Sequence, residues 1–502
     1  MAPLRRILIA NRGEIAVRII RTCRAEGLEV VVVYSEADQS EPHVKLADQA
    51  IPIGKAPAAE SYLNIANIID AARISGADAI HPGYGFLAER ADFAAAVIDA
   101  GLTFVGPSPD VMRSMGVKTE ARKIMEAAGV PVVPGNSDPL ESAAEGRRVA
   151  EAVGLPVLLK AAAGGGGKGM RLVTSMDDLE PEFERATSEA EKSFGDGSVY
   201  IERYIDRPRH VEIQLLADGR GNVRQLGERE CSIQRRHQKL IEEAPSPAVD
   251  GELRGALGRA ACSAALAVGY QGAGTVEFLL APDGKFYFLE MNTRIQVEHP
   301  ITEMIFGIDL VRWQLKIASG QELDLPEHLV SRGHAIECRI IAEDPTQDFM
   351  PSPGVIEYLE IPTGPGVRWD GGVVEGCAVG LYYDPLIAKL VVWGEDREQA
   401  IGRMRVALDE LTIVGIKTSQ PFHRSVMRDP GFCSGSYHTG FVAESADAWC
   451  ELSDADSMHF ALAAALVHKQ DSHRPPSAAT RGAKQNLWAT QARREALRNW
   501  QQ

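Results

Sequence analysis

The chain has 502 residues, of which 45% are hydrophobic and 24% are charged. That composition is typical of a folded globular protein and excludes a disordered or collagen-like chain. The 53 Lys and Arg residues against 69 Asp and Glu residues leave a formal net charge of −16, which argues against a general binder of nucleic acids or anionic membranes. At about 150 residues per domain, the length predicts about three domains or two large ones.

Seven cysteines are scattered along the chain and no Cys-x-x-Cys sequence occurs, so neither a disulfide framework nor a structural zinc site is indicated. The apolar run after the N-terminal arginines has only four residues, which is too short for the core of a signal peptide. No stretch approaches the ~18 apolar residues of a membrane span. We therefore expect a soluble cytoplasmic protein with reduced thiols.

The first part of the chain alternates between predicted strands and helices. Strands are expected over 6–10, over 28–34 and from Ala79, and helices from Glu14 and over 65–75. In the first helix one face is apolar at helical spacing, with Ile15, Ile19, Ile20 and Cys23. Strands joined by helices predict an α/β, Rossmann-like domain with a parallel sheet.

The rest of the chain is predicted to mix helices and strands after a boundary near 106–116. In order, we expect a helix over about 118–128, strands at 156–160 and from Met170, mostly strands from Val211 with one helix at about 252–268, and an α+β segment over 334–442. The end differs, with a short helix over 458–468, a linker over 473–482 and a basic amphipathic helix over 484–502. A partner-docking element and a mobile or self-packing terminus both fit this tail.

A glycine run at 164–167 lies between two predicted strands and is flanked by Lys160 and Lys168. Glycines expose backbone N–H groups and let the main chain approach a phosphate closely. A dinucleotide motif is not indicated, because a strand follows where that motif needs a helix. A Walker A motif fails because Ala162 and Gly169 replace its first Gly and its Ser or Thr. A strand–loop–strand hairpin over a triphosphate fits better, and a flexible loop is the alternative.

An Asp-Gly pair at 283–284 separates two apolar runs, which strongly favours a β-hairpin. A two-residue or four-residue loop centred on this pair places Glu277 directly opposite Glu290, with Cβ atoms ~5 Å apart. Like charges that face each other are destabilising unless a cation lies between them. Asn292 follows two residues later on the same face, so the three side chains make a hard oxygen site suited to Mg²⁺ or Mn²⁺.

If the same strand continues, its row of polar side chains extends to Arg294, Gln296 and Glu298. The alternative is a pair of solvated carboxylates on an exposed sheet face.

A basic run follows Glu230 and contains Gln234, two arginines, His237 and Lys239. So many cations and amides make a poor core, and by itself the segment is interpreted as a solvated basic loop. Close to Arg294 and Glu298 it would instead suit a small anion.

Together and in this order, these segments resemble the biotin carboxylase component of biotin-dependent carboxylases, a branch of the ATP-grasp enzymes. The resemblance runs over about 5–442. Its most specific pieces are Ile-Ala-Asn-Arg-Gly-Glu-Ile-Ala from Ile9, His-Pro-Gly-Tyr-Gly-Phe-Leu from His81, the glycine loop, the segment 228–239, Glu-Met-Asn-Thr-Arg-Ile-Gln-Val-Glu-His from Glu290 and His-Ala-Ile-Glu-Cys-Arg from His334. It implies an N-terminal domain over 1–116, an ATP-grasp domain over 117–330 with a lid at about 131–204, a C-terminal domain over 331–444 and a helical, basic extension over 445–502.

The resemblance also implies an ATP site between the glycine-rich lid and the central sheet. Lys118 and Lys160 would contact the phosphates, with Gly166 and Gly167 above them. The remaining nucleotide contacts would come from Glu202, Arg203, Ile205, His210, Gln234 and His237. Glu277 and Glu290, with Asn292, would hold the magnesium or manganese ions, which agrees with the hairpin register.

Bicarbonate would lie by Lys239, Arg294, Gln296 and Val297, with Glu298 as the base that removes its proton. Attack on the γ-phosphoryl group would give carboxyphosphate and ADP, and positive charge is needed there because the transferring group carries negative charge. Carboxyphosphate would decompose to CO₂ and phosphate, and phosphate would take the N1′ proton of biotin. Arg339 would stabilise the enolate oxygen of biotin, and Tyr84 and Gly85 would touch its ring.

No Ala-Met-Lys-Met biotinylation sequence occurs in the chain. We therefore expect a homodimeric subunit that serves biotin on a separate carrier protein, together with a separate carboxyltransferase. Acetyl-CoA carboxylase is the preferred setting, and propionyl-CoA, a branched acyl-CoA and pyruvate are the other candidate acceptors. The alternatives are another ATP-grasp ligase, such as a carbamoyl-phosphate or purine-pathway carboxylation enzyme, and a non-catalytic scaffold that binds ATP.

Overall fold

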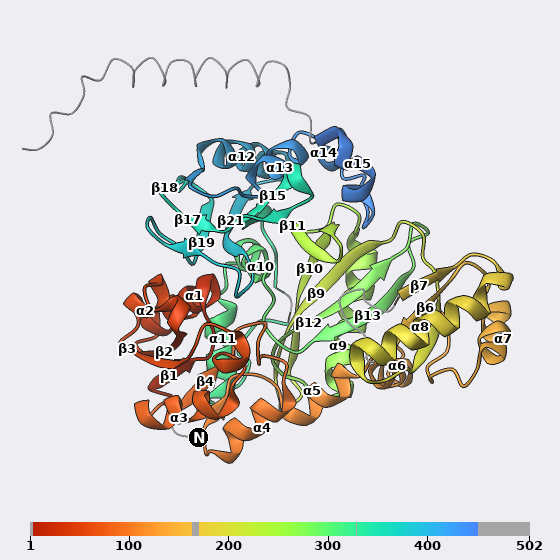
Figure 1. The fold of residues 1–502 in the computed structure, drawn as a ribbon, viewed down its shortest axis with the longest axis horizontal. Helices are drawn as coiled ribbons and strands as arrows, with labels where there is room; N and C mark the ends of the chain where they lie inside the picture. The colour runs from red at the N-terminus through yellow and green to blue at the C-terminus, as the bar shows by residue number, and fades with distance from the viewer. Residues whose placement is uncertain (1–3, 163–169, 328, 450–502) are drawn as a thin grey trace, which may run out of the picture. The chain divides into compact units, whose positions relative to one another are not determined.

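The N-terminal domain is built on a five-stranded parallel sheet with the order β3-β2-β1-β4-β5 (Figure 1). Its elements are β1 (Arg6–Ile9), α1 (Gly13–Ala25), β2 (Glu29–Ser35), α2 (Pro42–Leu46), β3 (Gln49–Gly54), α3 (Ile65–Ser75), β4 (Ala79–His81), α4 (Ala91–Asp99) and β5 (Thr103–Phe104). The predicted parallel sheet is confirmed. The predicted apolar face of α1 is also confirmed, because Ile15, Ile19, Ile20 and Cys23 are all buried.

The computed structural model describes residues 4–162, 170–327 and 329–449. Gly166, Gly167 and the elements predicted over 458–502 lie outside these ranges. Within them, no helix has both the length and the apolar character that crossing a membrane requires.

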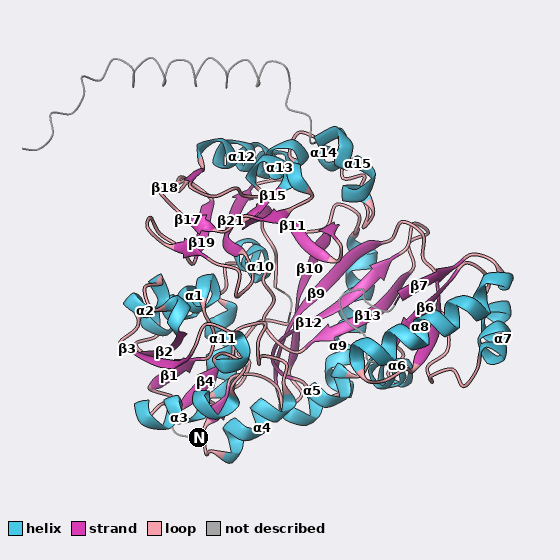
Figure 2. Cartoon of the chain, viewed as in Figure 1, coloured by secondary structure: helices cyan, strands magenta, loops and turns pink. Residues whose placement is uncertain are grey.

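The central sheet has eight strands in the order β13-β12-β9-β10-β11-β14-β21-β19, and all neighbours are antiparallel (Figure 2). The strands are β9 (Arg209–Asp218), β10 (Val223–Arg235), β11 (Gln238–Ala244), β12 (Gln271–Leu280), β13 (Phe286–Asn292), β14 (His334–Ile341), β19 (Val367–Gly371) and β21 (Leu386–Gly394). Because β11 pairs with β14, the sheet runs across the position predicted to separate the second and third domains.

A smaller sheet of three strands, β7-β6-β8, lies beyond β13 at the end of the central sheet away from the N-terminal domain (Figure 1). Its elements are α7 (Ala143–Val153), β6 (Val157–Ala161), β7 (Met170–Val173), α8 (Leu179–Phe194) and β8 (Val199–Arg203). β6 and β7 are antiparallel, with Lys160 paired to Met170. The predicted strand–loop–strand arrangement around the glycine run is therefore confirmed in its two strands.

Helices α6 (Lys118–Ala127) and α9 (Gly251–Ala267) agree with the helices predicted over about 118–128 and 252–268. Helix α5 (Pro109–Gly116) lies at the predicted domain boundary near 106–116. The expectation of a single helix between Val211 and 330 is wrong, because α10 (His299–Phe306) and α11 (Leu310–Ala318) follow β13. α10 is buried on most of its surface, so its sequence lacks the polar face that marks a surface helix, whereas Arg312 and Lys316 give α11 a polar stripe at helical spacing that was overlooked.

The C-terminal part is α+β, as predicted. Its helices are α12 (Arg397–Glu410), α13 (Gln420–Val426), α14 (Pro430–Cys433) and α15 (Phe441–Trp449). Short strands complete it: β15 (Glu343–Asp344), β16 (Met350–Pro351), β17 (Gly354–Val355), β18 (Tyr358–Glu360), β20 (Ala378–Val379) and β22 (Thr412–Val414).

Candidate active site

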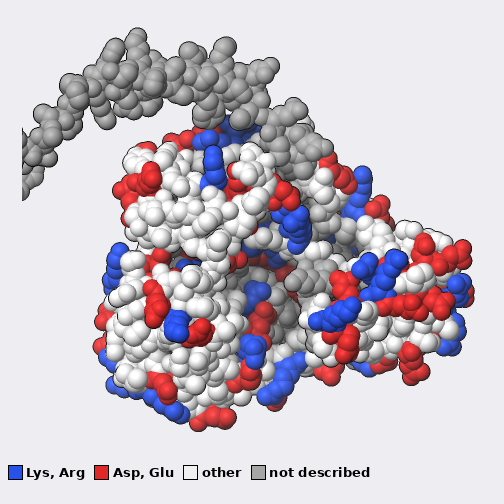
Figure 3. Space-filling view, viewed as in Figure 1, with Lys and Arg blue, Asp and Glu red and all other residues white. Residues whose placement is uncertain are grey.

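A cavity of about 1010 Å³ is lined by residues of the N-terminal domain, the lid, the central sheet and the C-terminal part. Acidic and basic side chains are both visible in the central hollow of the surface (Figure 3). The lining includes every described residue predicted for the site except Glu298: Tyr84, Gly85, Lys118, Lys160, Glu202, Arg203, Ile205, His210, Gln234, His237, Lys239, Glu277, Glu290, Asn292, Arg294, Gln296, Val297 and Arg339. Glu298 is fully buried behind Lys239 and Arg339, to which it is bonded.

The β12–β13 hairpin places Glu277 opposite Glu290, as predicted. The prediction assumed regular pairing along the whole hairpin, and this assumption is wrong near the turn. There Leu280 pairs with Phe286, one residue out of the predicted register. The pairing shifts back at a β-bulge, in which Leu289 is the extra residue. The bulge twists and bends the strand locally, and it aligns the two carboxylates only beyond that point.

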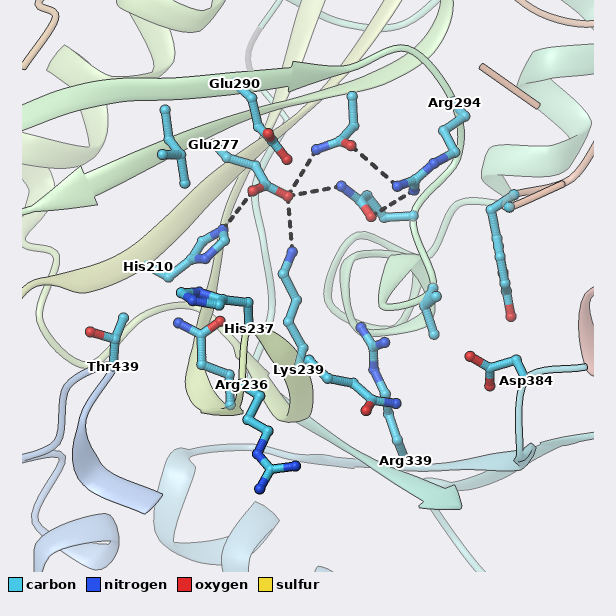
Figure 4. Close-up of a pocket in the computed structure, with 18 of the residues that line it drawn as sticks. His210, Arg236, His237, Lys239, Glu277, Glu290, Arg294, Arg339, Asp384 and Thr439 are labelled. Carbon is cyan, nitrogen blue, oxygen red and sulfur yellow. Dashed lines mark hydrogen bonds and ion pairs between the residues drawn. The ribbon is translucent and has the colours of Figure 1, made fainter. Parts of the chain in front are cut away.

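The Glu277 carboxylate is surrounded by four donor side chains (Figure 4). The distances are 2.9 Å to His210 Nε2, 3.0 Å to Lys239 Nζ, 2.9 Å to Asn292 Nδ2 and 3.1 Å to Gln296 Nε2. Burial acts to raise the pKa of Glu277, but Lys239 and His210 outweigh it and hold the pKa well below its usual range. Glu277 is therefore ionised at neutral pH.

Glu290 differs from its partner across the hairpin. Burial and the charge of Glu277 raise the pKa of Glu290, and the charges of Lys118 and His210 oppose that shift without outweighing it. A divalent cation between Glu277 and Glu290 would relieve that repulsion, and Asn292 offers an amide oxygen beside them. Two carboxylates and an amide oxygen are ligands that Mg²⁺ accepts, so the residues fit such an ion.

A second trio of ligand atoms lies close by, because His210, Glu212 and Glu277 each place one atom within 4.8 Å of the others. This trio is less suited to a cation, since Lys239 Nζ lies 2.6 Å and Arg229 Nε 2.5 Å from the Glu212 carboxylate oxygens. Glu212 instead neutralises buried cations.

Lys239 is the centre of a charged cluster at the base of the cavity. Its Nζ atom lies 2.6 Å from Glu298 Oε1, and Arg339 Nη2 lies 2.8 Å from Glu298 Oε2. Burial acts to raise the pKa of Glu298, but Lys239 and Arg339 together hold it well below its usual range. An ionised carboxylate therefore lies between two cations, in an arrangement that can receive a small anion and accept a proton from it.

The loop 293–298 carries the polar row beyond the hairpin. The prediction that the strand continues there is wrong, because β13 ends at Asn292 and Pro300 in the first turn of α10 has no N–H for a ladder. The loop still points its polar groups into the cavity: Arg294 Nη1 donates to Gln296 Oε1 at 2.8 Å, and Gln296 donates to Glu277. Only the tertiary fold decides this orientation.

The basic run at 230–239 is not a solvated loop, and that interpretation is wrong. It forms the end of β10, a two-residue turn and the start of β11, with Arg236 and His237 both at positive φ. Most of its charge is neutralised by carboxylates of other elements: Arg235 and Arg236 pair with Asp348, and Lys239 with glutamates of the central sheet. Such partners cannot be read from a local sequence.

The lid end of the cavity holds the residues predicted to meet ATP. Lys160 and Arg122 both donate to the buried Glu202 carboxylate. Burial lowers the pKa of Lys118, because it outweighs the attraction of Glu290 and other nearby carboxylates. Burial and the charge of Lys118 likewise lower the pKa of His237. The amino groups of Lys118 and Lys160 suit a polyanion that enters this part of the cavity.

Four polar residues of the site were missed by sequence reasoning: Glu89, Glu212, Arg229 and Glu242. Glu89 accepts from Arg294 Nε at 2.9 Å, and Glu242 accepts from Arg339 Nε at 2.6 Å. The signal for Glu212 was available, because His210, Glu212 and Gln214 alternate with apolar residues in a buried strand. No local pattern distinguishes Glu242 from its neighbour Glu243.

Family models match three consecutive parts of the chain. "Biotin carboxylase, N-terminal domain" matches 3–112, "Carbamoyl-phosphate synthase L chain, ATP binding domain" matches 117–326, and "Biotin carboxylase C-terminal domain" matches 337–444.

Curated relatives cover most of the chain. Biotin carboxylase of Nostoc sp. is 54% identical over 440 residues, which is 88% of this chain and 98% of that protein. Biotin carboxylase 1 of Bacillus subtilis is 52% identical over 441 residues, with coverage of 88% and 98%. A pyruvate carboxylase subunit from Methanothermobacter thermautotrophicus is 52% identical over 440 residues, with coverage of 88% and 89%.

Solved structures are also similar to this chain over most of its length. A biotin carboxylase–β-γ-ATP complex from Campylobacter jejuni has a TM-score of 0.85 and 50% identity, covering 88% of this chain and 99% of that one. The biotin carboxylase domain dimer of Hydrogenobacter thermophilus 2-oxoglutarate carboxylase, in complex with MgADP, ADP and bicarbonate, has a TM-score of 0.86 and 46% identity, covering 90% and 100%.

Proposed function

Because the chain belongs to the biotin carboxylase family of ATP-dependent ligases, we propose that it uses ATP and bicarbonate to carboxylate biotin on a carrier protein. The observation that carries the proposal is the convergence of Lys239 and Arg339 on Glu298 at 2.6 and 2.8 Å, beside the Glu277–Glu290 pair. A rival ATP-grasp ligase would need a different acceptor site at this position.

ATP would lie between the lid and the hairpin β12–β13. Lys118 and Lys160 both line the cavity, and an incoming phosphate would compete with Glu202 for Lys160. Glu277, Glu290 and Asn292 would hold Mg²⁺, which neutralises phosphate charge when bound. The crystallised relative that contains MgADP supports this assignment by analogy.

Bicarbonate would bind beside Lys239, Arg294, Gln296 and Val297. Once the anion competes with Glu298 for Lys239, the basicity of Glu298 rises and it accepts the bicarbonate proton. The freed oxygen attacks the γ-phosphorus, the bond from that phosphorus to the bridging oxygen breaks, and carboxyphosphate and ADP form.

Biotin would enter by Tyr84 and Gly85. Carboxyphosphate decomposes to CO₂ and phosphate, the phosphate takes the N1′ proton, and N1′ then forms its bond to CO₂. Arg339 would stabilise the developing enolate oxygen by charge.

The first test is ADP release by the purified chain with Mg²⁺ and bicarbonate, with and without free biotin. We expect biotin-stimulated release in the wild type and its loss in Glu298→Gln. The matched control is Glu243→Gln, an equally buried carboxylate whose partners, His334 and Arg397, lie outside the cavity.

The three other outcomes are each informative. Bicarbonate-dependent release without any effect of biotin would indicate another ATP-grasp ligase. ATP binding without turnover, even with a carrier protein, would favour a scaffold. Equal losses in Glu298→Gln and Glu243→Gln would contradict the assigned base.

The final acceptor is proposed to be an acyl-CoA, with acetyl-CoA first. Two relatives named simply biotin carboxylase support a subunit that serves a separate carboxyltransferase. Pyruvate is the second candidate, because the pyruvate carboxylase subunit from Methanothermobacter thermautotrophicus is 52% identical over a similar length. The test is to isolate the native complex on the tagged chain, load it with labelled bicarbonate, and offer acetyl-CoA, propionyl-CoA or pyruvate.

The proposed partners are a biotin carrier protein, a carboxyltransferase and a second copy of this chain. The related domain that crystallised as a dimer supports the last of these by analogy. Analytical ultracentrifugation of the chain alone tests the dimer. For the basic tail, docking onto a partner and a mobile or self-packing terminus are both open, and deletion of 470–502 followed by complex isolation would distinguish them.

A further inference from the structure

Lys389 and Glu14 form a buried ion pair that the reaction steps above do not use. Lys389 lies on β21 with none of its side chain exposed, and its Nζ atom is 3.2 Å from Glu14 Oε2 on α1. Desolvating two charges costs free energy that a simple ion pair often fails to recover. The further contacts of this pair therefore need an explanation.

The first contact reaches the loop that carries the assigned base. Lys389 Nζ donates to the Val297 carbonyl oxygen at 2.8 Å. Lys389 is also the direct cross-strand partner of Arg339, whose Nη2 lies 2.8 Å from Glu298 Oε2. Lys389 thus holds the backbone of Val297, and the adjacent Arg339 holds the side chain of Glu298, the next residue of the loop.

The second contact reaches Tyr84, which also lines the cavity. The Tyr84 hydroxyl donates to Glu14 Oε1, the carboxylate oxygen that does not face Lys389. Tyr84 belongs to the N-terminal domain, Val297 to the loop after β13 and Lys389 to the C-terminal part. One chain of contacts, Tyr84–Glu14–Lys389–Val297, therefore joins three separate parts of the chain around the cavity.

The other charged groups near Lys389 are engaged elsewhere or neutral. Asp370 is its cross-strand partner on β19, but it pairs with Arg368 at 2.7 Å. Glu337 is fully buried, its oxygens have no hydrogen bond among the described residues, and burial raises its pKa far above the usual range. Burial also raises the pKa of Glu14, and Lys389 opposes that shift. Lys389 and Glu14 are thus each other's main charge partners.

We infer that Lys389 is a positioning residue which, through Glu14 and the Val297 carbonyl, sets the spacing between Tyr84 and the bicarbonate-binding loop 293–298. The inference rests on the proposed function. On this inference, the Lys389–Glu14 pair aligns the carboxyl donor with the biotin ring. Such alignment matters because misplacing reacting groups by about 1 Å is enough to slow a reaction about a hundredfold.

The test compares Lys389→Met, Glu14→Gln and the double variant in steady-state assays with free biotin. Positioning predicts that kcat falls by up to about a hundredfold and that the KM values for bicarbonate and biotin rise about tenfold, whereas the KM for ATP changes less than about twofold. The ATP contacts predicted at Lys118 and Lys160 lie at the lid end and do not touch this chain of contacts.

The double variant separates positioning from stability. Each single change leaves one buried charge without its partner, but the double change leaves neither, so the urea midpoint should recover toward wild type. The raised KM values for bicarbonate and biotin should persist in the double variant. The matched control is Arg397→Met, which breaks the buried pair with Glu243 and should lower stability without changing any KM.

Two results would overturn the inference: unchanged KM values in the folded variants, or KM values that return to wild type together with stability in the double variant. A wild-type protein that forms no carboxybiotin would instead overturn the proposed function, so the two failures are distinguishable.

Discussion

Glu242 and Glu243 are neighbours on β11, both are buried to 1% exposure or less, and they face opposite sides of the central sheet. On one side, Glu243 accepts from His334 at 2.6 Å, from Arg397 at 2.7 and 2.9 Å, and from the Tyr437 hydroxyl. These partners outweigh burial and lower the pKa of Glu243 to about 2. This is a fully satisfied structural network.

On the other side, Glu242 lies opposite Glu337 of β14 and beside Arg339, which lines the cavity. Only one of its oxygens is bonded within the described part of the chain, to Arg339 at 2.6 Å. Burial outweighs Arg339 and raises the pKa of Glu242 to about 7. The difference teaches that two neighbouring glutamates of equal burial acquire pKa values on opposite sides of the ordinary one, because the number of partners differs between the two faces of the sheet.

The largest effect expected from this comparison is on catalysis. Glu298→Gln should lower biotin-dependent ADP release roughly 10³-fold, because a general base contributes about 10²–10⁴-fold. Glu243→Gln, on the structural face, should keep kcat per folded molecule. Stopped assays of ADP release, normalised to the folded fraction by circular dichroism, check both. Comparable losses in the two variants would remove the distinction between the faces.

The next effect is on the pH dependence of stability, and it has opposite signs on the two faces. The lowered pKa of Glu243 stabilises the fold fully above the ordinary pKa of 4.5, and this contribution is lost as the pH falls toward about 2. The raised pKa of Glu242 lowers stability as the pH rises from 4.5 to about 7. Each amounts to roughly 3 kcal/mol at most.

Urea unfolding of Glu242→Gln and Glu243→Gln at about pH 5 and about pH 8 tests these signs. Relative to wild type, Glu242→Gln should gain stability between the two pH values, whereas the deficit of Glu243→Gln should stay constant. If the change in unfolding free energy relative to wild type had the same pH dependence in both variants, the two faces would not differ in protonation.

A third effect concerns the metal site. Glu290→Gln should raise the Mg²⁺ concentration for half-maximal ADP release about tenfold, because it removes one hard ligand and one of the two negative charges that attract the cation. Titration with Mg²⁺ at saturating ATP measures it. Glu303→Gln, another buried carboxylate outside the cavity lining, is the control, and an equal shift there would argue against a ligand role.

The smallest effect is expected at the surface. Asp348, which is 73% exposed, pairs with Arg235 and Arg236 at the tip of the β10–β11 hairpin. Exposed pairs are screened by water and salt, so Asp348→Asn should leave the urea midpoint unchanged. A clear loss of stability in that variant would mean that pairing matters irrespective of burial.

Much of the fold could be predicted because its signals are local. The helix over 65–75 agrees with the structure at both ends, and the parallel strands follow from their apolar runs. The hairpin pair Glu277–Glu290 was also predicted, although a bulge at Leu289 makes the real ladder irregular. Helix α10 escaped because it is buried almost all round, and a buried helix has no polar face to reveal its period, whereas the period of α11 could have been read from Arg312 and Lys316.

The sequence by itself determined which residues carry the chemistry: the carboxylates, cations and glycines stand in recognisable order. Only the tertiary structure decided which charge neutralises which. Arg235 and Asp348, Lys239 and Glu298, or Lys389 and Glu14 are separated by long stretches of chain, so no local pattern pairs them. The reason is physical: burial and partner number, which set a charge's pKa and its role, come from elements that meet only when the sheet is assembled.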